Sequence, residues 1–341
     1  MKRFSVIIPA YNAQATIARC LDSVYALSVS ETEFEVIVID DCSTDGTVGA
    51  VENYARIHSN LSLLLQPQNH RQGAARNRGL SVANGQYIVF LDSDDEVDSG
   101  LLTALNLASG NNLEMTAMRG VRRNREGKVL GWFELGYPND YVFSGTVLQQ
   151  EHPYWCTGVV LYVYLKSFLE TVDYPFEEDV LFEDSDFVNV HLYHATRMSY
   201  SDDCGYTIHE NLSSTTHTTS YKHVCDYALL GTRMLDFYHR LERRDTPYAD
   251  SILEGGSYNI MKSCRALFRL KSFQDVRAFY DRLDEHVDRK NYLSYREPAY
   301  CWTPWTRFCL KHRNLTIGLV GCVVSTRLLE LKRVIKKLKH A

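Results

Sequence analysis

The sequence predicts an α/β fold, a doubly wound and mainly parallel sheet of Rossmann-like type with a helical region after it. Strand and helix patterns alternate through the first third of the 341 residues, an order typical of parallel sheets with helices on both faces. From about residue 218, apolar residues recur only at helical spacing. Acidic residues also follow the predicted strands, at the edge where open α/β sheets bind ligands. We therefore expect a binding site on this sheet.

The first strands and helices follow from apolar periodicity. β-branched and apolar runs predict strands at residues 4–8, 35–40, 61–65 and 87–91. Apolar or small residues at helical spacing predict the intervening helices, at about 17–24, 48–55 and 73–83. Right-handed crossovers bring the C-terminal ends of parallel strands to one edge of the sheet. The residues that follow those ends should therefore meet.

Composition describes an ordinary globular protein and excludes several classes. Apolar residues make up 45% of the chain and charged residues 23%, as in average soluble domains. A net charge of −5 gives no support for nucleic acid as the main partner. Nine cysteines without a Cys-x-x-Cys pair match neither a disulfide framework nor a zinc site. With no signal-peptide pattern and no run of about 18 apolar residues, we expect a cytoplasmic protein.

Three carboxylates stand at the end of the strand that begins at Tyr87. Asp92, Asp94 and Asp95 follow its apolar run almost at once. Crowded carboxylates repel one another, and a hard divalent cation with oxygen ligands relieves the repulsion. The alternative is an acidic turn in solvent, since aspartate is common in turns.

The exits of the first two strands carry complementary chemistry. Tyr11 follows the first strand, and Asp40, Asp41 and Asp45 follow the second. An aromatic face stacks on a base, and a carboxylate accepts a hydrogen bond from a base N–H. A nucleotide fits this set of groups. Each group also has a simpler explanation, with Tyr11 capping the core and the aspartates forming a helix N-cap with Asx-turns.

Common nucleotide-binding motifs are missing from the sequence. No Gly-x-Gly-x-x-Gly follows the first strand, and the chain has no Walker-type Gly-Lys-Ser/Thr. Five segments together instead resemble the inverting family 2 glycosyltransferases of GT-A fold, in order and spacing over residues 3–215. The segments are Val6–Asn12, Val36–Thr47, Asn69 with Gly73–Gly79, Ala83–Asp95 and Glu183–Phe187. Cys42 departs from the pattern, because the family more often has Gly at this turn.

This resemblance implies a nucleotide site. Tyr11 would stack on the base, most often uracil, and Asp41 would accept from the base N3–H. Arg76 would approach the base or the diphosphate, and its alternative is an ion pair on the helix surface. The nucleotide site would further include Pro9, Asp92 and Ser93.

The resemblance also implies a metal site. Asp94, with help from Asp92 or Asp95, would hold Mn²⁺ or Mg²⁺ against the diphosphate, where the ion acts as a Lewis acid and a template. His209 lies in a segment that resembles the family's closing loop, and it would contact phosphate or metal. The alternative for a lone histidine is a surface or structural position.

A second acidic motif lies about ninety residues after the first. The family's Glu-Asp-x-x-Phe pattern falls on Glu183, Asp184 and Phe187. A sugar hydroxyl is a poor nucleophile, so a carboxylate must accept its proton as the new bond forms. By resemblance Asp184 is this base and Glu183 orients the acceptor, which predicts inversion at the anomeric carbon. The alternative is an acidic helix N-terminus favoured by the helix dipole.

Other segments carry weaker signals. Residues 118–143 are rich in Gly and Arg and predict a β-hairpin or a variable loop. Trp155 and residues 159–165 would either floor the acceptor site or pack in the core. The C-terminus forms a basic amphipathic stripe, with apolar Leu328, Leu331, Ile335 and Leu338 among lysines. Such a helix binds the inner face of a membrane, packs on protein or forms a dimer.

Together these features predict a metal-dependent inverting glycosyltransferase. Its donor would be a nucleotide sugar, in particular a UDP-sugar, and its acceptor a hydroxyl of a glycan or lipid-linked glycan in surface polysaccharide synthesis. We expect a GT-A domain at 1–217, with a nucleotide half (1–96) and an acceptor half (97–217), and a helical region at 218–341. The alternatives are a binding scaffold with a decayed site and a nucleotidyltransferase. The latter lacks its Gly-rich basic loop here.

Overall fold

The structure is a computed structural model that describes residues 2–139, 141–152, 158–211 and 220–242, with isolated residues from 249 to 262. Internal contacts divide the chain into two compact units, residues 1–214 with 246–251, and residues 215–245 with 252–341. The described part of the second unit is mainly the helix α8 (Tyr221–Arg240). The functional division predicted after residue 217 stays a prediction, and the C-terminal amphipathic stripe lies outside the described residues, as does Trp155.

The first unit begins with the alternating elements that the sequence predicts. They are β1 (Lys2–Ala10), α1 (Ile17–Tyr25), β2 (Phe34–Asp40), α2 (Thr47–Ile57), β3 (Leu61–Leu65), α3 (Arg71–Val82) and β4 (Gly85–Phe90). The predicted strands and helices match these bounds to within a few residues, because each segment has its own local pattern of apolar or small residues.

The remainder of this unit adds shorter strands and helices. They are β5 (Glu96–Val97), α4 (Gly100–Asn111), β6 (Met115–Arg123), β7 (Val129–Phe133), α5 (Gly145–Glu151), a 3₁₀ turn (Val159–Leu161), β8 (Tyr162–Leu165), α6 (Lys166–Val172), α7 (Asp184–His194) and β9 (Met198–His209). The hairpin predicted within 118–143 is confirmed as the antiparallel pair β6–β7.

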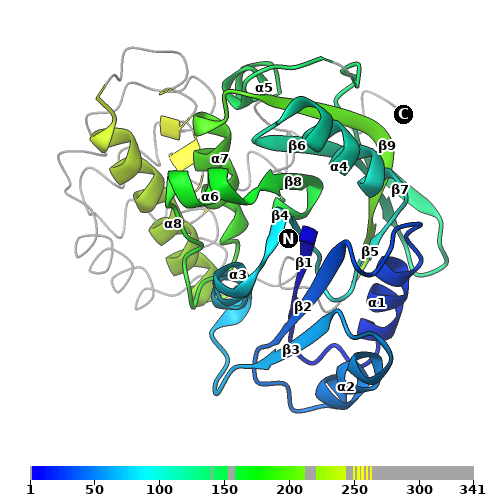
Figure 1. Cartoon of the computed structure of the whole chain (residues 1–341). Coiled ribbons are helices and arrows are strands. Elements are labelled where there is room, and N and C mark those ends of the chain that lie inside the picture. Colours follow the sequence, from blue (N-terminus) through cyan, green and yellow to red (C-terminus); the bar gives the residue numbers. More distant parts are fainter. Residues whose placement is uncertain are drawn as a thin grey trace, which may run out of the picture. The chain divides into compact units, whose positions relative to one another are not determined.

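All the strands join one sheet, in the order β3-β2-β1-β4-β8-β6-β9-β5, with β7 beside β6. The first four are parallel. Beyond β4, β8 is antiparallel to both neighbours, and β9 is parallel to β6. Figure 1 shows α1 and α2 on one side of the first strands and α3 on the other, as right-handed crossovers in both directions require. The first four strands therefore form a doubly wound parallel half, as predicted, whereas the antiparallel pairs of β5, β7 and β8 make the sheet as a whole mixed.

Strand β1 lies at the centre of the parallel half and is buried from Phe4 to Ala10. Its pairing with β4 ends at Ile7, opposite Phe90, whereas its pairing with β2 continues to Ala10, opposite Asp40. Pro9 lacks an N–H and lies beyond the last β4 pair, so it leaves no ladder bond unmade. Strands β1 and β4 therefore separate at their C-terminal ends, where the acidic residues after β4 begin.

Aromatic rings fill the core beneath the β4 exit. Phe90 is fully buried, and its ring meets Phe176, Tyr164 and Phe187 edge-on at centroid distances of 5.4, 5.7 and 6.3 Å. Phe176 and Phe187 stack on each other at 3.8 Å. This cluster ties β4 to the start of α7.

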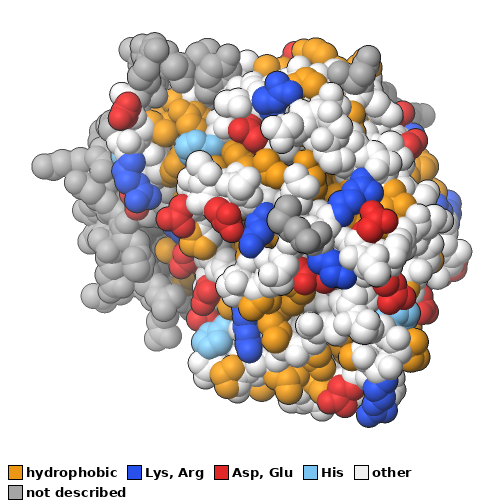
Figure 2. Space-filling view, viewed as in Figure 1, with side chains coloured by type: hydrophobic (Ala, Val, Ile, Leu, Met, Phe, Trp, Pro, Cys, Tyr) orange, Lys and Arg blue, Asp and Glu red, His pale blue; other side chains and the backbone are white. Residues whose placement is uncertain are grey.

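Figure 2 shows the surface on the side of the molecule seen in Figure 1. Basic and acidic side chains are interspersed there with apolar ones.

We predict that Phe90→Ala lowers the free energy of unfolding by about 3–5 kcal/mol, because it empties a fully buried aromatic site. Urea unfolding followed by circular dichroism measures this change. The matched control is Ile57→Ala, at a side chain that is 77% exposed, and it should change stability by less than about 0.5 kcal/mol. Equal stabilities for the two variants would contradict the packing described here.

Candidate active site

The exits of β1, β2 and β4 meet at one edge of the sheet. The backbone N–H of Asp41 donates to the Ala10 carbonyl at 2.8 Å, and that of Leu91 donates to the Ile7 carbonyl at 3.0 Å. Asp41 is itself one of the linked residues, Tyr11 follows Ala10, and Asp92 follows Leu91. Three of the predicted site residues therefore stand at the same end of adjacent strands.

The loop after β1 is fastened to the loop after β2. The backbone N–H of Asn12 donates to Ser43 Oγ at 2.9 Å, and Asn12 Oδ1 accepts from the Thr44 N–H at 2.8 Å. Tyr11 is 50% exposed, so it is no cap on the core and its ring is open to a flat partner. Pro9 is buried, opposite Ile39 of β2.

Asp41 is buried and organises the segment that leads into α3. Its Oδ1 accepts from Gln66 Nε2 at 2.7 Å and from the His70 N–H at 2.8 Å, and its Oδ2 accepts from the Arg71 N–H at 2.7 Å. Burial raises the pKa of Asp41, and the two backbone N–H donors oppose that rise. Because a carboxylate oxygen carries two lone pairs, Oδ2 retains one for a further donor.

The acids after β4 have different partners. Asp92 Oδ1 accepts from Arg76 at 2.7 Å, and Asp94 Oδ2 accepts from Asn211 at 3.0 Å. Asp95 is buried, with Oδ2 accepting from the Tyr206 hydroxyl at 2.9 Å and Oδ1 from the His209 N–H at 2.8 Å. Asp95 therefore anchors β9 to residues 92–95, which we call the acidic loop.

The electrostatics of these acids favour a cation. Burial raises the pKa of Asp94, and the charge of Asp92 raises it further. The pKa of Asp95 rises well above its usual range, through burial and through the charges of Asp92 and Asp94. A positive charge placed beside them would reverse this effect.

The residues present fit a divalent ion that shares its coordination with a substrate. Asp92 Oδ2 and Asp94 Oδ1 have no hydrogen-bond partner among the described residues, whereas both oxygens of Asp95 are engaged. No three His, Cys, Asp or Glu side chains within the described ranges converge on a complete metal site. Mg²⁺ is commonly held by one or two carboxylates together with substrate phosphates. Ser93 lies half-buried between the two available carboxylates.

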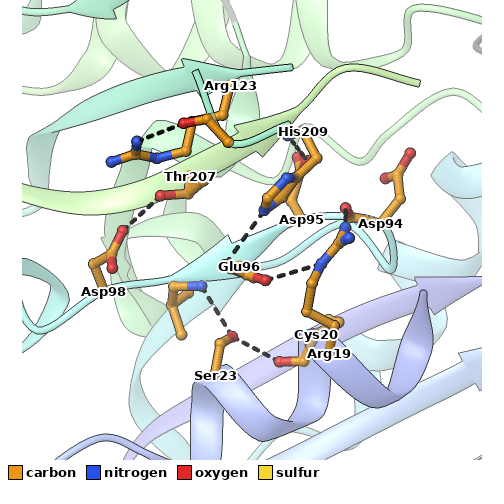
Figure 3. A network of polar contacts seen from close by, with 12 residues as sticks. Arg19, Cys20, Ser23, Asp94, Asp95, Glu96, Asp98, Arg123, Thr207 and His209 are labelled. Carbon is orange, nitrogen blue, oxygen red and sulfur yellow. Dashed lines mark hydrogen bonds and ion pairs between the residues drawn. The ribbon is translucent and has the colours of Figure 1, made fainter. Parts of the chain in front are cut away.

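His209 takes part in a polar network beside the acidic loop (Figure 3). Its Nε2 lies 3.3 Å from Glu96 Oε2, without hydrogen-bond geometry. Arg19 pairs with the other Glu96 oxygen at 2.9 Å and donates to the Asp94 carbonyl at 2.5 Å. The imidazole thus faces Glu96, and the histidine backbone is the part that contacts Asp95.

Arg76 joins the two acidic motifs. It is only 2% exposed, and it donates to Glu183 Oε1 with one terminal nitrogen and to Asp92 with the other. Burial alone would lower the pKa of Arg76, but the charges of Asp92 and Glu183 raise it above its ordinary value. Burial raises the pKa of Glu183, and the charge of Arg76 opposes this rise. The arginine is thus a buried cross-link, and the alternative of a surface ion pair is excluded.

This cross-link requires α3 to approach the second motif closely. A Cβ at Gly73 would lie 2.2 Å from the Glu177 carbonyl oxygen and 3.3 Å from Glu183 Cγ. Asn77, one turn further on, donates from Nδ2 to the Phe176 carbonyl at 2.9 Å. Gly73 and Asn77 therefore set the distance between α3 and the segment before α7.

Asp184 begins α7, directly after the buried Glu183. It is half-buried and close enough to Arg76 to raise the pKa of the guanidinium. Asp184 thus lies at an acidic helix N-terminus and near Arg76, and its role as the base stays a prediction. Two residues on, the fully buried Asp186 accepts from the Tyr174 hydroxyl at 2.9 Å.

Left-handed backbone conformations gather around this site. Positive φ angles occur at Asn12 (48°), Cys42 (65°), Arg71 (67°), Asp179 (60°) and Phe182 (67°). Non-glycine residues adopt such angles at a cost of about 1–3 kcal/mol each. The φ of Cys42 gives the physical reason why Gly is usual at that turn.

Comparison with known proteins decides the family of this domain. Residues 5–156 match the family model described as Glycosyl transferase family 2. Residues 5–156 form a family 2 glycosyltransferase domain.

Two curated relatives of this stretch are named as transferases of poly(ribitol-phosphate). The poly(ribitol-phosphate) β-N-acetylglucosaminyltransferase TarS of Staphylococcus aureus strain Mu50 is 42% identical over 103 residues, which cover 30% of this chain and 18% of TarS. A poly(ribitol-phosphate) β-glucosyltransferase of Bacillus spizizenii is 34% identical over 116 residues, covering 33% of this chain and 18% of that protein. The matched segments thus span about a fifth of these relatives' lengths.

Solved structures confirm the fold. Residues 1–349 of S. aureus TarS in complex with UDP-GlcNAc superpose with a TM-score of 0.69 and 22% identity, covering 96% of this chain and 92% of that one. The mannosyltransferase PcManGT of Pyrobaculum calidifontis, solved with GDP-Man and Mn²⁺, gives a TM-score of 0.53 with 19% identity, over 94% and 87% of the chains. The predicted GT-A fold is therefore confirmed.

Several residues that hold the candidate site in place were missed by sequence reasoning. Gln66 and the His70 and Arg71 backbone hold Asp41, Tyr206 holds Asp95, and the Arg19–Glu96 pair holds the Asp94 carbonyl. Their sequence signals are weak, because each is a single polar residue on an otherwise ordinary strand, helix or loop.

We predict that Arg76→Met destabilises the domain by about 3–5 kcal/mol, because it leaves the Glu183 carboxylate buried without its partner. The pKa of Glu183 should then rise further, so the folded state binds a proton that the unfolded state releases. Stability must fall as pH rises above the unfolded pKa of about 4.3, by up to about 1.4 kcal/mol per pH unit. Urea unfolding from pH 5 to 8 measures this slope.

The matched control is the double variant Arg76→Met/Glu183→Gln, which removes the buried charge together with its partner. It should lose the added pH dependence and regain part of the stability. A single variant whose pH dependence equals that of the double variant would contradict the cross-link.

Proposed function

We propose that this protein is a metal-dependent inverting glycosyltransferase that moves a sugar from a UDP-sugar to a hydroxyl of a glycan or lipid-linked glycan. The observation that carries the proposal is the Arg76 bridge, which joins the strand end bearing Asp92 to the helix start bearing Glu183 and Asp184. Donor-binding and proton-accepting groups thus lie within one cluster. The family match of residues 5–156 supports the same reaction class.

The nucleotide side of the site is formed by the β1 and β2 exits. Tyr11 offers an exposed ring for the base, and the remaining lone pair on Asp41 Oδ2 accepts from the uracil N3–H. TarS, whose fold this chain shares, was solved with UDP-GlcNAc and with UDP, which supports uracil as the base. Since the terminal nitrogens of Arg76 are engaged by Asp92 and Glu183, we assign Arg76 to positioning these acids rather than to the diphosphate.

Asp94 and Asp92 would hold a Mn²⁺ or Mg²⁺ ion through their available oxygens. When bound, such an ion neutralises the departing nucleoside diphosphate and fixes its position. Asp95 and His209 then have supporting roles, because both oxygens of Asp95 are engaged and the imidazole faces Glu96. The Mn²⁺ in the mannosyltransferase structure supports a metal in this fold.

Asp184 would act as the base. Asp184 accepts the proton of the attacking acceptor hydroxyl. The neighbouring Glu183 is buried and is held in position by Arg76. One base opposite one leaving group gives a single in-line displacement, so the anomeric configuration inverts. The two-carboxylate mechanism of retaining glycoside hydrolases uses a second carboxylate as nucleophile, about 5 Å from the first. The mechanism proposed here uses no such nucleophile.

The relatives' names support an acceptor in surface-polymer synthesis, because two of them modify poly(ribitol-phosphate). No helix within the described residues combines the length and apolar character needed to cross a membrane. A cytoplasmic location and peripheral contact through the C-terminal stripe are part of the proposal, and deletion of residues 326–341 followed by liposome sedimentation tests that contact.

We predict that Asp94→Ala abolishes transfer and the Mn²⁺-dependent part of donor binding. In a thermal-shift assay, wild type should melt higher with UDP-GlcNAc and Mn²⁺ than with UDP-GlcNAc alone, because a ligand that binds only the folded state raises its melting temperature. The variant should show no such added rise. The control Asp203→Ala, at an exposed acid of β9, should behave as wild type. Full activity in Asp94→Ala would refute the metal assignment.

We predict that Asp184→Asn binds donor normally but transfers sugar about 10²–10⁴-fold more slowly, since general base catalysis contributes this much. The melting-temperature rise with UDP-GlcNAc and Mn²⁺ should equal that of wild type, while kcat falls. A helix-capping role alone would change stability by about 0.3–1 kcal/mol and leave kcat intact. Retained transfer would place the base elsewhere.

A further inference from the structure

The hairpin formed by β6 and β7 concentrates positive charge in a protein that is negative overall. Between residues 119 and 128 it carries five basic side chains and one acidic one, in a chain of net charge −5. The basic residues, which with Trp132 we call the cationic strip, are Arg119, Arg122, Arg123, Arg125 and Lys128.

Most of these charges have no counter-ion within the described part of the chain. Arg123 Nη1 donates to the Gly127 carbonyl at 3.1 Å. Among the described residues, no carboxylate pairs with Arg122, Arg123, Arg125 or Lys128. Arg122 Nε is buried and has no hydrogen-bond partner in that part of the chain, and unsatisfied buried donors are rare in native proteins. The strip therefore has unused capacity for an anion.

An exposed aromatic ring completes the strip. Trp132 is 45% exposed, and the Arg119 guanidinium lies 4.3 Å from the centre of its ring. Arg119 is itself held by Glu134 at 2.8 Å. The tryptophan ring is thus fixed on one face by a cation, and the amphipathic ring suits a partner that is polar at one side and apolar at the other.

Strand register connects this hairpin to the candidate active site. Glu96 of β5 pairs with Thr207 of β9, Thr207 pairs with Val121 of β6, and Val121 pairs with Trp132 of β7. Paired residues on neighbouring strands share a face of the sheet, and three strand spacings amount to about 14 Å. In the sheet order, β9 lies between β5 and β6, and β7 pairs with the other edge of β6.

The next row of the register carries charge along the same path. His209 pairs with Arg123 across β9 and β6, and Arg123 pairs with Val129 across β6 and β7. His209 also contacts Asp95 through its backbone. The first row is buried at Thr207 and Val121, whereas His209 and Arg123 of the second row are half-buried and Val129 is exposed. A chain that extends from the site toward the outer strand would therefore follow the second row and meet Arg123.

The turn of the hairpin is fixed in place. Asn124 Oδ1 accepts from the Glu126 N–H at 3.1 Å and the Lys128 N–H at 2.8 Å, and the Gly127 N–H donates to the Asn124 carbonyl at 3.0 Å. Gly127 takes a φ of 78°, which a glycine adopts without strain. Arg125 and Lys128 therefore project from a preorganised turn, while the other basic residues of the strip lie on β6.

We propose that the cationic strip is an acceptor subsite that binds the part of an anionic, chain-like acceptor that lies beyond the reacting sugar hydroxyl. The chemistry recognised is a repeated negative charge, phosphodiester or carboxylate, spaced along a hydroxylated chain. The proposal rests on the glycosyltransferase function proposed above and adds the acceptor's charge to it.

A membrane surface is the competing partner for basic and aromatic side chains. Apolar side chains that insert into lipid should lie outermost, whereas here the turn itself is polar from Asn124 to Lys128. The exposed Val129, Leu130 and Trp132 lie behind it, along β7. The arrangement therefore favours a polar chain lying across the strands.

The test measures binding of labelled oligomers by fluorescence anisotropy to wild type and to the double variant Arg123→Gln/Arg125→Gln. The probes are a ribitol-phosphate oligomer, an oligogalacturonate of the same length and a neutral dextran. Both anionic probes, or the one whose charge spacing fits, should bind wild type more tightly than dextran and more weakly at high salt. The double variant should lose about five- to tenfold in affinity, as two exposed ionic contacts contribute.

The matched control is Arg56→Gln/Arg78→Gln, which also removes two charges. Arg78 donates to a backbone carbonyl as Arg123 does, and Arg56 is exposed on α2. This control should bind as wild type does. The proposal would be overturned by equal binding of all three probes or by equal affinities of the strip variant and wild type. With anionic lipid vesicles as a further probe, it would also be overturned if the strip variant lost affinity for the vesicles alone.

The thermal-shift response to UDP-GlcNAc and Mn²⁺ separates the two failures. In the strip variant this response and the KM for donor should be unchanged, while the KM for an anionic acceptor rises. If wild type itself gives no donor response and no transfer, the proposed function fails. If wild type responds to donor and the strip variant binds oligomers normally, only the acceptor subsite fails.

Discussion

The buried guanidinium of Arg76 is the constraint on which the rest of this site depends. It lies on α3, donates to Asp92 at the end of β4 and to Glu183 before α7, and is almost inaccessible to water. A buried ion pair gains little net stability over an apolar replacement, but the loss of one partner is costly. Its consequence here is geometric, because Arg76 fixes the positions of both acidic motifs relative to α3. The close approach at Gly73 makes this possible.

The acids of the site divide into those that build it and those left available. Asp41 and Asp95 are buried, and their oxygens hold backbone N–H groups, Gln66 or Tyr206. Asp92 and Asp94 each keep an oxygen without a partner among the described residues. Carboxylates that look equivalent in a motif thus have different roles. The number of hydrogen-bond donors around each one decides whether it holds the structure or keeps an oxygen for a ligand. The left-handed backbone at Cys42, Arg71 and Phe182 is retained at the same loops, as expected where the surroundings determine conformation.

The two halves of the sheet contribute different features. The parallel half supplies aligned strand ends, so its exits supply residues to one edge. The mixed half places β9 beside the acidic loop and continues outward to β6 and β7. This topology places the proposed donor site at the first half and the proposed acceptor subsite on the second.

The sequence by itself determined the parallel strands, the helices between them and the acidic residues at their ends, because period and polarity are local properties. It also indicated the family, through several short segments in a fixed order. The tertiary structure alone decided the role of Arg76, whose partner Glu183 lies 107 positions away, and which of Asp92, Asp94 and Asp95 keep available oxygens. It also decided that Trp132 and Arg123 lie in register with Glu96 and His209. These outcomes depend on long-range pairing and on burial, and neither quantity is encoded in the residues next to a motif.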